Sequence, residues 1–132
     1  MEIIINAEGA ILGRMSTYAA KQALQGNKII VVNCGKALIT GNRGALQEVY
    51  LNKRTRGGTS QKGPYFSKVP ERIVRRTIRG MLPWKKTTGR EAFKRIFCYN
   101  DVPAEYSNKE KLIFKKEIKS RHMTVEELSK HI

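Results

Sequence analysis

The sequence predicts an α/β fold with a parallel sheet, because of the order in which its strand-like and helix-like segments follow one another. Residues 2–6 (EIIIN) and 28–33 (KIIVVN) are short, continuous, β-branched runs, the pattern of strands that are buried on both faces of a parallel sheet. A helix-like segment lies between them. Strand, helix and strand within about thirty residues form a right-handed βαβ unit.

The first helix is predicted from apolar residues at helical spacing, namely Leu12, Met15, Ala19 and Ala23. Leu24 widens this stripe, and Gln25–Asn27 (QGN) supply the C-terminal stop. A second helix is predicted over residues 45–54, with inward-facing Leu46, Val49 and Tyr50. Thr55–Pro70 is rich in Gly, Ser and Lys, so we expect a long exposed basic loop there.

A third helix is predicted from Pro70 to Leu82, because proline at the first helical position removes an N–H that would have lacked a partner anyway. At about 100° per residue, this helix has one basic side and one packing side. The basic side carries Arg72, Arg75, Arg76 and Arg79. The packing side carries Ile73, Val74, Thr77, Ile78 and Met81, and Leu82 continues it.

Pro83 ends the third helix, and residues 85–89 (KKTTG) are expected to form a turn. A short helix is expected over 90–96, followed by a strand at Ile96–Tyr99. The hydrophobic pattern predicts fewer elements in the C-terminal tail, residues 107–132. The run 112–114 (LIF) is compatible with a strand there.

The last helix is predicted from Thr124 and Glu127, which form the Thr-x-x-Glu pattern of a capping box. We expect residues 1–132 to form a single domain, since this length suits one hydrophobic core.

The positive charge is concentrated in the middle of the chain. Twenty-six Lys and Arg against eleven Asp and Glu give a net charge of +15. Residues 53–95 hold fourteen basic side chains against only Glu71 and Glu91, which is +12 of that total. Self-repulsion of this size destabilises a compact state unless an anion neutralises it, so we expect a polyanionic partner.

Several other classes of protein are disfavoured. No run approaches the roughly eighteen to twenty apolar residues that cross a bilayer, so we expect a cytoplasmic protein with no membrane partner. Cys34 and Cys98 lack C-x-x-C spacing and are expected to be reduced core thiols. No third ligand stands beside His122 and His131, so we expect no metal site.

Catalytic and nucleotide-binding motifs are not found either. Gly9 and Gly13 lack the G-x-G-x-x-G spacing, and the sequence contains no G-x-x-x-x-G-K-[ST] loop. No His stands near a Ser or Cys, and the acids do not form a candidate pair. We therefore expect no enzyme activity, no cofactor and no small-molecule substrate.

Three basic segments are candidates for contact with a polyanion. Thr40–Gly44 (TGNRG) suits a phosphate but fits a plain helix N-cap equally well. The arginine side of the third helix favours phosphate, because a solvated helix usually interleaves glutamates and this one has only Glu71. Trp84, beside Lys85 and Lys86, is compatible both with capping the core and with stacking on an unpaired base.

The sequence resembles the L-thirteen family of large-subunit ribosomal proteins over residues 5–103. The resemblance rests on GAILGRMST, IIVVNCGKALITGN and above all PERIVRRTIRGMLPWKKTTGREAFKRI, followed by YNDVP. The direct LQGNKII connection between the first helix and the second strand, with the VPAEY continuation, is similar to the archaeal and eukaryotic branch. We expect the archaeal form.

The resemblance implies a three-layer α/β/α fold around a mostly parallel four-stranded sheet. It also implies a non-catalytic, structural protein that binds large-subunit rRNA early in assembly, beside neighbouring large-subunit proteins. Together, charge and resemblance nominate these RNA-binding residues: Lys36, Thr40, Asn42, Arg43, Lys53, Arg54, Arg56, Lys62, Lys68, Arg72, Arg75, Arg76, Arg79, Trp84, Lys85, Lys86, Arg90 and Lys94.

Two alternatives use the same chain differently. An architectural DNA-binding protein would use the same charges, although the sequence contains no recognisable recognition-helix motif. A nucleotide-dependent enzyme on an α/β scaffold would bind ATP or NAD as an isolated domain. Competition between RNA and DNA at fixed salt separates the first alternative from rRNA binding.

Overall fold

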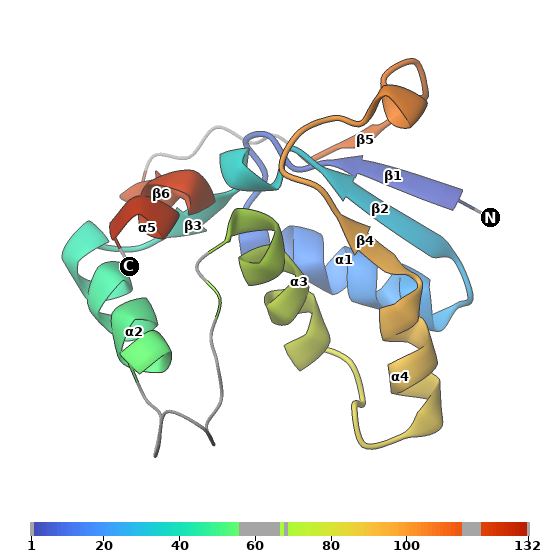
Figure 1. Ribbon diagram of the computed structural model, residues 1–132, viewed down its shortest axis with the longest axis horizontal. Helices are drawn as coiled ribbons and strands as arrows, with labels where there is room; N and C mark the ends of the chain where they lie inside the picture. Colours follow the sequence, from blue (N-terminus) through green and yellow to red (C-terminus); the bar gives the residue numbers. More distant parts are fainter. Residues whose placement is uncertain (1, 56–66, 68, 115–119, 132) are drawn as a thin grey trace.

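The computed structural model describes residues 2–55, 67, 69–114 and 120–131. Its first three elements are β1 (Glu2–Asn6), α1 (Leu12–Leu24) and β2 (Lys28–Val32). β1 and β2 are parallel, with Ile4 opposite Ile30, so the predicted βαβ unit is confirmed. Figure 1 shows α1 lying against one face of these strands.

The main sheet has four strands in the order β4-β2-β1-β5, and its three pairings are all parallel. β4 (Ile96–Cys98) pairs with β2, as expected for the apolar run there. β5 (Leu112–Ile113) pairs with β1 at the other edge, which resolves the LIF segment as a strand. The α/β class with its mostly parallel four-stranded sheet is therefore confirmed.

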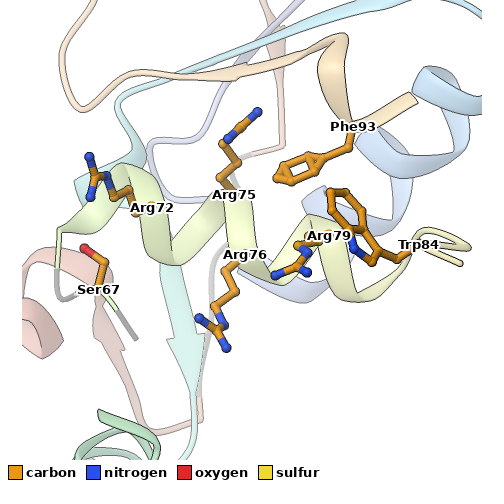
Figure 2. Close-up of a pocket in the computed structure, with 7 residues that line it drawn as sticks. All are labelled: Ser67, Arg72, Arg75, Arg76, Arg79, Trp84 and Phe93. Carbon is orange, nitrogen blue, oxygen red and sulfur yellow. The ribbon is translucent and has the colours of Figure 1, made fainter. Parts of the chain in front are cut away.

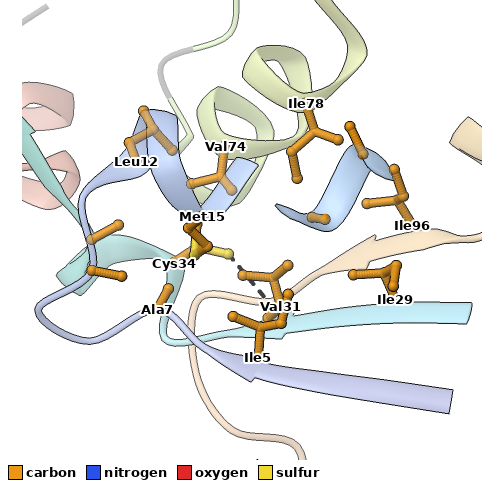
Figure 3. Close-up of a cluster of buried hydrophobic side chains, with 14 of the residues drawn as sticks. Ile5, Ala7, Leu12, Met15, Ile29, Val31, Cys34, Val74, Ile78 and Ile96 are labelled. Atoms are coloured by element: carbon orange, nitrogen blue, oxygen red, sulfur yellow. Dashed lines mark hydrogen bonds between the residues drawn. The ribbon is translucent and has the colours of Figure 1, made fainter. Parts of the chain in front are cut away.

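One face of the sheet carries the larger core. Its buried side chains Ile5, Ile29, Val31 and Ile96 pack in one cluster with Met15 of α1 and with α3 (Pro70–Gly80) (Figure 3). The short helix α4 (Thr87–Lys94) contributes Ala92 to the same cluster. This face therefore fixes α3 and α4 relative to the strands.

The opposite face has a thinner cover. Ile4, Ile30 and Val32 pack there against Tyr106 in the 3-10 helix η2 (Ala104–Tyr106), with Tyr99 and Val102 alongside. Because α1, α3 and α4 all lie on the first face, the second outer layer is formed by this short segment and not by a long helix.

A second, two-stranded sheet lies beside the main one and was not predicted. β3 (Leu38–Thr40), after the 3-10 helix η1 (Cys34–Lys36), pairs antiparallel with β6 (His122–Thr124). Two helices flank it, α2 (Arg43–Thr55) and α5 (Val125–His131). The helix predicted from the capping box is confirmed as α5, since the Glu127 N–H donates to Thr124 Oγ1 at 3.1 Å.

Three residues that were predicted to face the core are exposed instead. Leu24 is 45% exposed at the last position of α1, and Met81 is 41% exposed because α3 ends one residue before it. Val49 is 50% exposed, because α2 packs against α5 and only a narrow stripe around the half-buried Leu46 and Tyr50 is covered. Local periodicity does not reveal how wide a face the neighbours cover.

The boundaries around Pro83 also differ slightly from expectation. α3 ends at Gly80, while Leu82 is buried as predicted. α4 begins at Thr87, so it includes residues that were assigned to a turn. Gly89 permits the close approach of α4 to Pro83, because a Cβ at that position would overlap the carbonyl of Pro83.

Both cysteines are free thiols, Cys34 buried and Cys98 half-buried. A hydrogen bond with Cys98 and burial raise the pKa of the Cys34 thiol well above its usual range. In the described part of the chain, no three His, Cys, Asp or Glu side chains are grouped so that they could hold a metal ion. No described helix has the length and apolarity to cross a membrane.

Candidate nucleic-acid interface

α3 presents a basic surface because its apolar residues anchor the other side. Pro70 stands at its start, and Ile73, Val74 and Ile78 are buried. The four arginines, Arg72, Arg75, Arg76 and Arg79, fall on the side away from these residues, and all but the half-buried Arg79 are exposed. The predicted division into a packing side and a guanidinium side is therefore confirmed.

The turn after α3 brings an aromatic pair beside these arginines. The Trp84 N–H donates to the Leu82 carbonyl at 2.8 Å, and Lys86 N–H to the Pro83 carbonyl at 2.9 Å, which closes a tight bend. Arg90 Nε donates to the Trp84 carbonyl at 3.0 Å and ties the bend to α4. Trp84 consequently meets Phe93 of α4 edge to face, with ring centres 5.1 Å apart and planes at 66°.

Two of the arginines lie against this aromatic pair. The guanidinium carbon of Arg75 is 4.0 Å from the centre of the Phe93 ring, and that of Arg79 is 4.2 Å from the centre of Trp84 (Figure 2). Arg75 Nε also donates to the Ile96 carbonyl at 3.4 Å. Cation–π contacts restrict the guanidinium groups while their N–H donors stay available to a ligand.

The same side chains line a pocket of about 560 Å³. Its lining is Ser67, Arg72, Arg75, Arg76, Arg79, Trp84 and Phe93, hereafter the arginine groove. Its described lining residues include four cations and no acid, so its field attracts anions. Guanidinium groups bind phosphate with two parallel hydrogen bonds. The rings of Phe93 and Trp84 hold the guanidinium groups of Arg75 and Arg79 in place.

Trp84 therefore has a position that neither sequence interpretation described fully. Its side chain is 38% exposed, and one contact is with Phe93 while another is with the Arg79 guanidinium. The Trp84 ring therefore supports the Arg79 guanidinium group from one side. Phe93 was missed by the sequence analysis, because its role depends on how α4 crosses α3.

Other nominated residues lie outside the lining of the groove. Lys85, Lys86 and Lys94 are exposed on the bend and on α4, which extends the basic surface beyond the groove. Lys36 is exposed on η1, and the Lys53 Nζ lies 4.9 Å from the centre of the Tyr50 ring on α2.

Four nominated side chains cannot be placed. Arg56, Lys62 and Lys68 lie outside the described residues, as does most of the predicted loop. Arg54 belongs to α2, but its side chain is outside the description.

The Thr40–Arg43 turn belongs to a second pocket of about 490 Å³. Thr40 is exposed at the end of β3, and Asn42 caps α2, since its Oδ1 accepts from the Gly44 N–H at 2.9 Å. The lining is Asn42, Arg43, Ser120, Arg121 and His122. Ser120, Arg121 and His122 were not predicted to lie here, because only the pairing of β6 with β3 brings them to this turn. The one sequence feature that points to them is the adjacent basic pair Arg121 and His122.

Comparison with known proteins identifies the family. The model of the family described as "Ribosomal protein L13" matches residues 1–105. The chain is 42% identical to "Large ribosomal subunit protein uL13" of Archaeoglobus fulgidus, over 98% of this chain and 86% of that protein. It is 42% identical to the protein of the same name from Methanocaldococcus jannaschii, over 98% and 96% of the two chains. The counterpart from Thermoplasma acidophilum is 46% identical over 77% of this chain and 74% of its own. These relatives are archaeal, as expected, and the chain belongs to the ribosomal protein L13 family.

Proposed function

We propose that this protein is a structural constituent of the large ribosomal subunit and binds the rRNA of that subunit through the arginine groove. The observation that carries the proposal is the groove itself, which four arginines of one helix line, with no acid among its described lining residues. Relatives over nearly the whole chain are named large-subunit proteins, which supports the subunit assignment.

The groove acts by neutralising phosphates at fixed positions. Each arginine that contacts a phosphate releases counterions from the RNA, so binding weakens as salt rises. Specificity comes from the shape of the folded RNA, because side chains do not reach the deep major groove of an A-form duplex. The role is structural and not catalytic: the protein joins the cytoplasmic subunit early, beside neighbouring proteins, and holds the RNA fold.

The proposal is tested by the salt dependence of binding to a full-length large-subunit rRNA transcript. Engagement of all four arginines contributes about 2.8 to 3.6 to the magnitude of the slope of log K against log salt, at roughly 0.7 to 0.9 per contact. The variant Arg72→Gln/Arg76→Gln should lower the slope by about 1.4 to 1.8. Lys109→Gln is the matched control, because Lys109 pairs with Glu2 and lies outside the groove.

The same measurement includes the main alternative as a competitor. Duplex DNA that displaces the rRNA at equal concentration and fixed salt would favour an architectural DNA-binding protein. An unchanged slope in the double arginine variant would exclude the groove as the rRNA site.

A further inference from the structure

The two cysteines of the chain lie next to each other at one end of the main sheet, although they are far apart in the sequence. Cys98 ends β4, and its register partner on β2 is Val31. The chain leaves β2 through Asn33, which has a left-handed φ of 58°. The Cys34 N–H then donates to the Tyr99 carbonyl at 3.2 Å. Cys34 is therefore held against the residue that directly follows Cys98.

The Cys34 sulfur lies where β2 and β4 are joined by hydrogen bonds. Cys34 Sγ donates to the Val31 carbonyl at 3.7 Å (Figure 3), and the same oxygen accepts the Tyr99 N–H at 2.8 Å. The Cys98 side chain lies on the same side of β4 as the buried Ile96, because side chains two positions apart share a face. Cys98 consequently packs against the buried cluster that contains Cys34. Both sulfurs belong to one face of the sheet.

The two thiols differ in their access to solvent. Cys34 is 0% exposed, whereas Cys98 is half-buried, so a soluble reagent reaches the Cys98 sulfur first. A hydrogen bond with Cys98, together with burial, raises the pKa of the Cys34 thiol. Cys34 therefore stays protonated and does not compete for an oxidant, since the thiolate is the reactive form. An accessible cysteine beside a second, protected one is the usual arrangement of a redox-sensitive pair.

We propose that Cys98 is a site of reversible oxidation by peroxides and that Cys34 resolves the product into an intramolecular disulfide. The Cys98 sulfur attacks the peroxide, the O–O bond breaks, and Cys98 becomes a sulfenic acid while its proton leaves with the other oxygen as water or an alcohol. The Cys34 sulfur then attacks the Cys98 sulfur, the S–O bond breaks, and the hydroxyl group leaves with the Cys34 proton as water. The peroxide gains the two electrons that the thiols lose, and a thiol reductant reverses the reaction by exchange.

The disulfide closes a loop that contains the charged middle of the chain. Residues 53–95, with fourteen basic side chains against two acids, lie between the two cysteines. Self-repulsion in this segment destabilises the free protein, and a crosslink at its base stabilises the fold by restricting the unfolded chain. Neither cysteine is among the described residues that line the arginine groove, so the disulfide and a ligand of the groove do not compete. The sulfur chemistry requires no RNA and is independent of the proposed function.

The test treats the reduced full chain with hydrogen peroxide in the absence of RNA. Both thiols should disappear together in a thiol assay under denaturing conditions, and the mass of the monomer should fall by that of two hydrogen atoms. Dithiothreitol should restore both thiols. The melting temperature of the oxidised form should be higher by roughly 5 to 15 °C, as expected for a crosslink that closes a long loop in a domain of this size. Binding to the rRNA transcript at fixed salt should not change.

Two single variants separate the roles of the sulfurs. In Cys34→Ala the oxidation of Cys98 should stop at the sulfenic acid, which dimedone traps as a stable adduct. In Cys98→Ala the buried Cys34 should remain a free thiol at the same peroxide concentration. Neither variant should gain melting temperature on oxidation, and each is compared with its own reduced form, so that the effect of the substitution on stability cancels. Cys98→Ala changes a half-buried position and serves as the folded control where Cys34→Ala is too unstable.

Three results would overturn the inference. The first is survival of both thiols at a peroxide concentration that oxidises Cys98 in Cys34→Ala. The second is a monomer whose mass rises by that of added oxygen atoms, which shows that Cys98 is oxidised without being resolved by Cys34. The third is a covalent dimer joined through Cys98. An oxidised form that melts no higher than the reduced form would refute the stabilising role of the crosslink. The salt-slope test of the arginine groove can fail without affecting any of these results.

Discussion

Replacing Trp84 distinguishes a ring that positions an arginine from a ring that stacks on a base. In the structure the Arg79 guanidinium carbon lies 4.2 Å from the centre of this ring. A cation–π contact at such a partly exposed site contributes about 0.5 to 1 kcal/mol. If Trp84 only positions Arg79, Trp84→Ala should weaken rRNA binding by about 2- to 5-fold. Base stacking contributes about 1 to 3 kcal/mol per base, which is roughly a 5- to 150-fold loss.

The assay is a double-mutant cycle on rRNA affinity, measured over a series of salt concentrations. Arg79→Gln should lower the salt slope by about 0.7 to 0.9, whereas Trp84→Ala should leave it unchanged because no charge is removed. In the Arg79→Gln background, Trp84→Ala should have almost no further effect, since the group it positions is gone. Trp84→Phe is the control, because it keeps an aromatic face beside Arg79.

The reasoning would be refuted by additive losses in the cycle. A Trp84→Ala loss well above fivefold that persists in Arg79→Gln would assign the ring to an RNA base and not to the arginine. The assay must be run well below the melting temperature, because Trp84→Ala also removes the edge-to-face pair with Phe93, which is worth about 0.5 to 1.5 kcal/mol of stability.

Two further predictions concern the scaffold. Gly89→Ala should destabilise the fold by roughly 1 to 3 kcal/mol in urea unfolding, because the added Cβ overlaps the Pro83 carbonyl; Gly13→Ala, where nothing lies within 4 Å, should be neutral or stabilising, and equal effects would contradict the packing argument. The raised pKa of the Cys34 thiol, caused by Cys98 and by burial, stabilises the fold below the ordinary thiol pKa of 9.0, and this contribution should be lost as pH rises above that value. Unfolding free energies of the wild type and Cys34→Ala between pH 8 and 10 should therefore converge at the alkaline end by up to about 1.4 kcal/mol per pH unit, and parallel curves would contradict the assignment.

The arginine helix was predictable because its signal is local. Pro70 marks its start, and the 3.6-residue period separates Ile73 and Val74 from Arg72 and Arg76 without any knowledge of the partners. The βαβ unit was predictable for the same reason, since continuous β-branched runs show burial on both faces. In both cases each helix or strand is indicated by the pattern of its own residues, without reference to distant parts of the chain.

The second pocket was not predictable, because its signal is distributed. β3 and β6 have three residues each, too few for a reliable alternation, and their pairing joins segments about eighty positions apart. Phe93 was missed on similar grounds: nothing in its neighbourhood shows that α4 returns beside Arg75. Contacts between elements determine where these residues lie, and periodicity within one element carries no information about such contacts.

The placement of acids explains why a strongly basic surface persists on α3. Ion pairs in the described part of the chain join Glu2, Glu126 and Glu127 to cations elsewhere, and none reaches Arg72, Arg75 or Arg79. Arg75 and Arg79 instead lie against aromatic rings, which hold a guanidinium without neutralising it. An internal carboxylate would lower the repulsion but would have to be displaced by every incoming phosphate. Aromatic support avoids that competition, so the repulsion that destabilises the free protein becomes attraction for a polyanion.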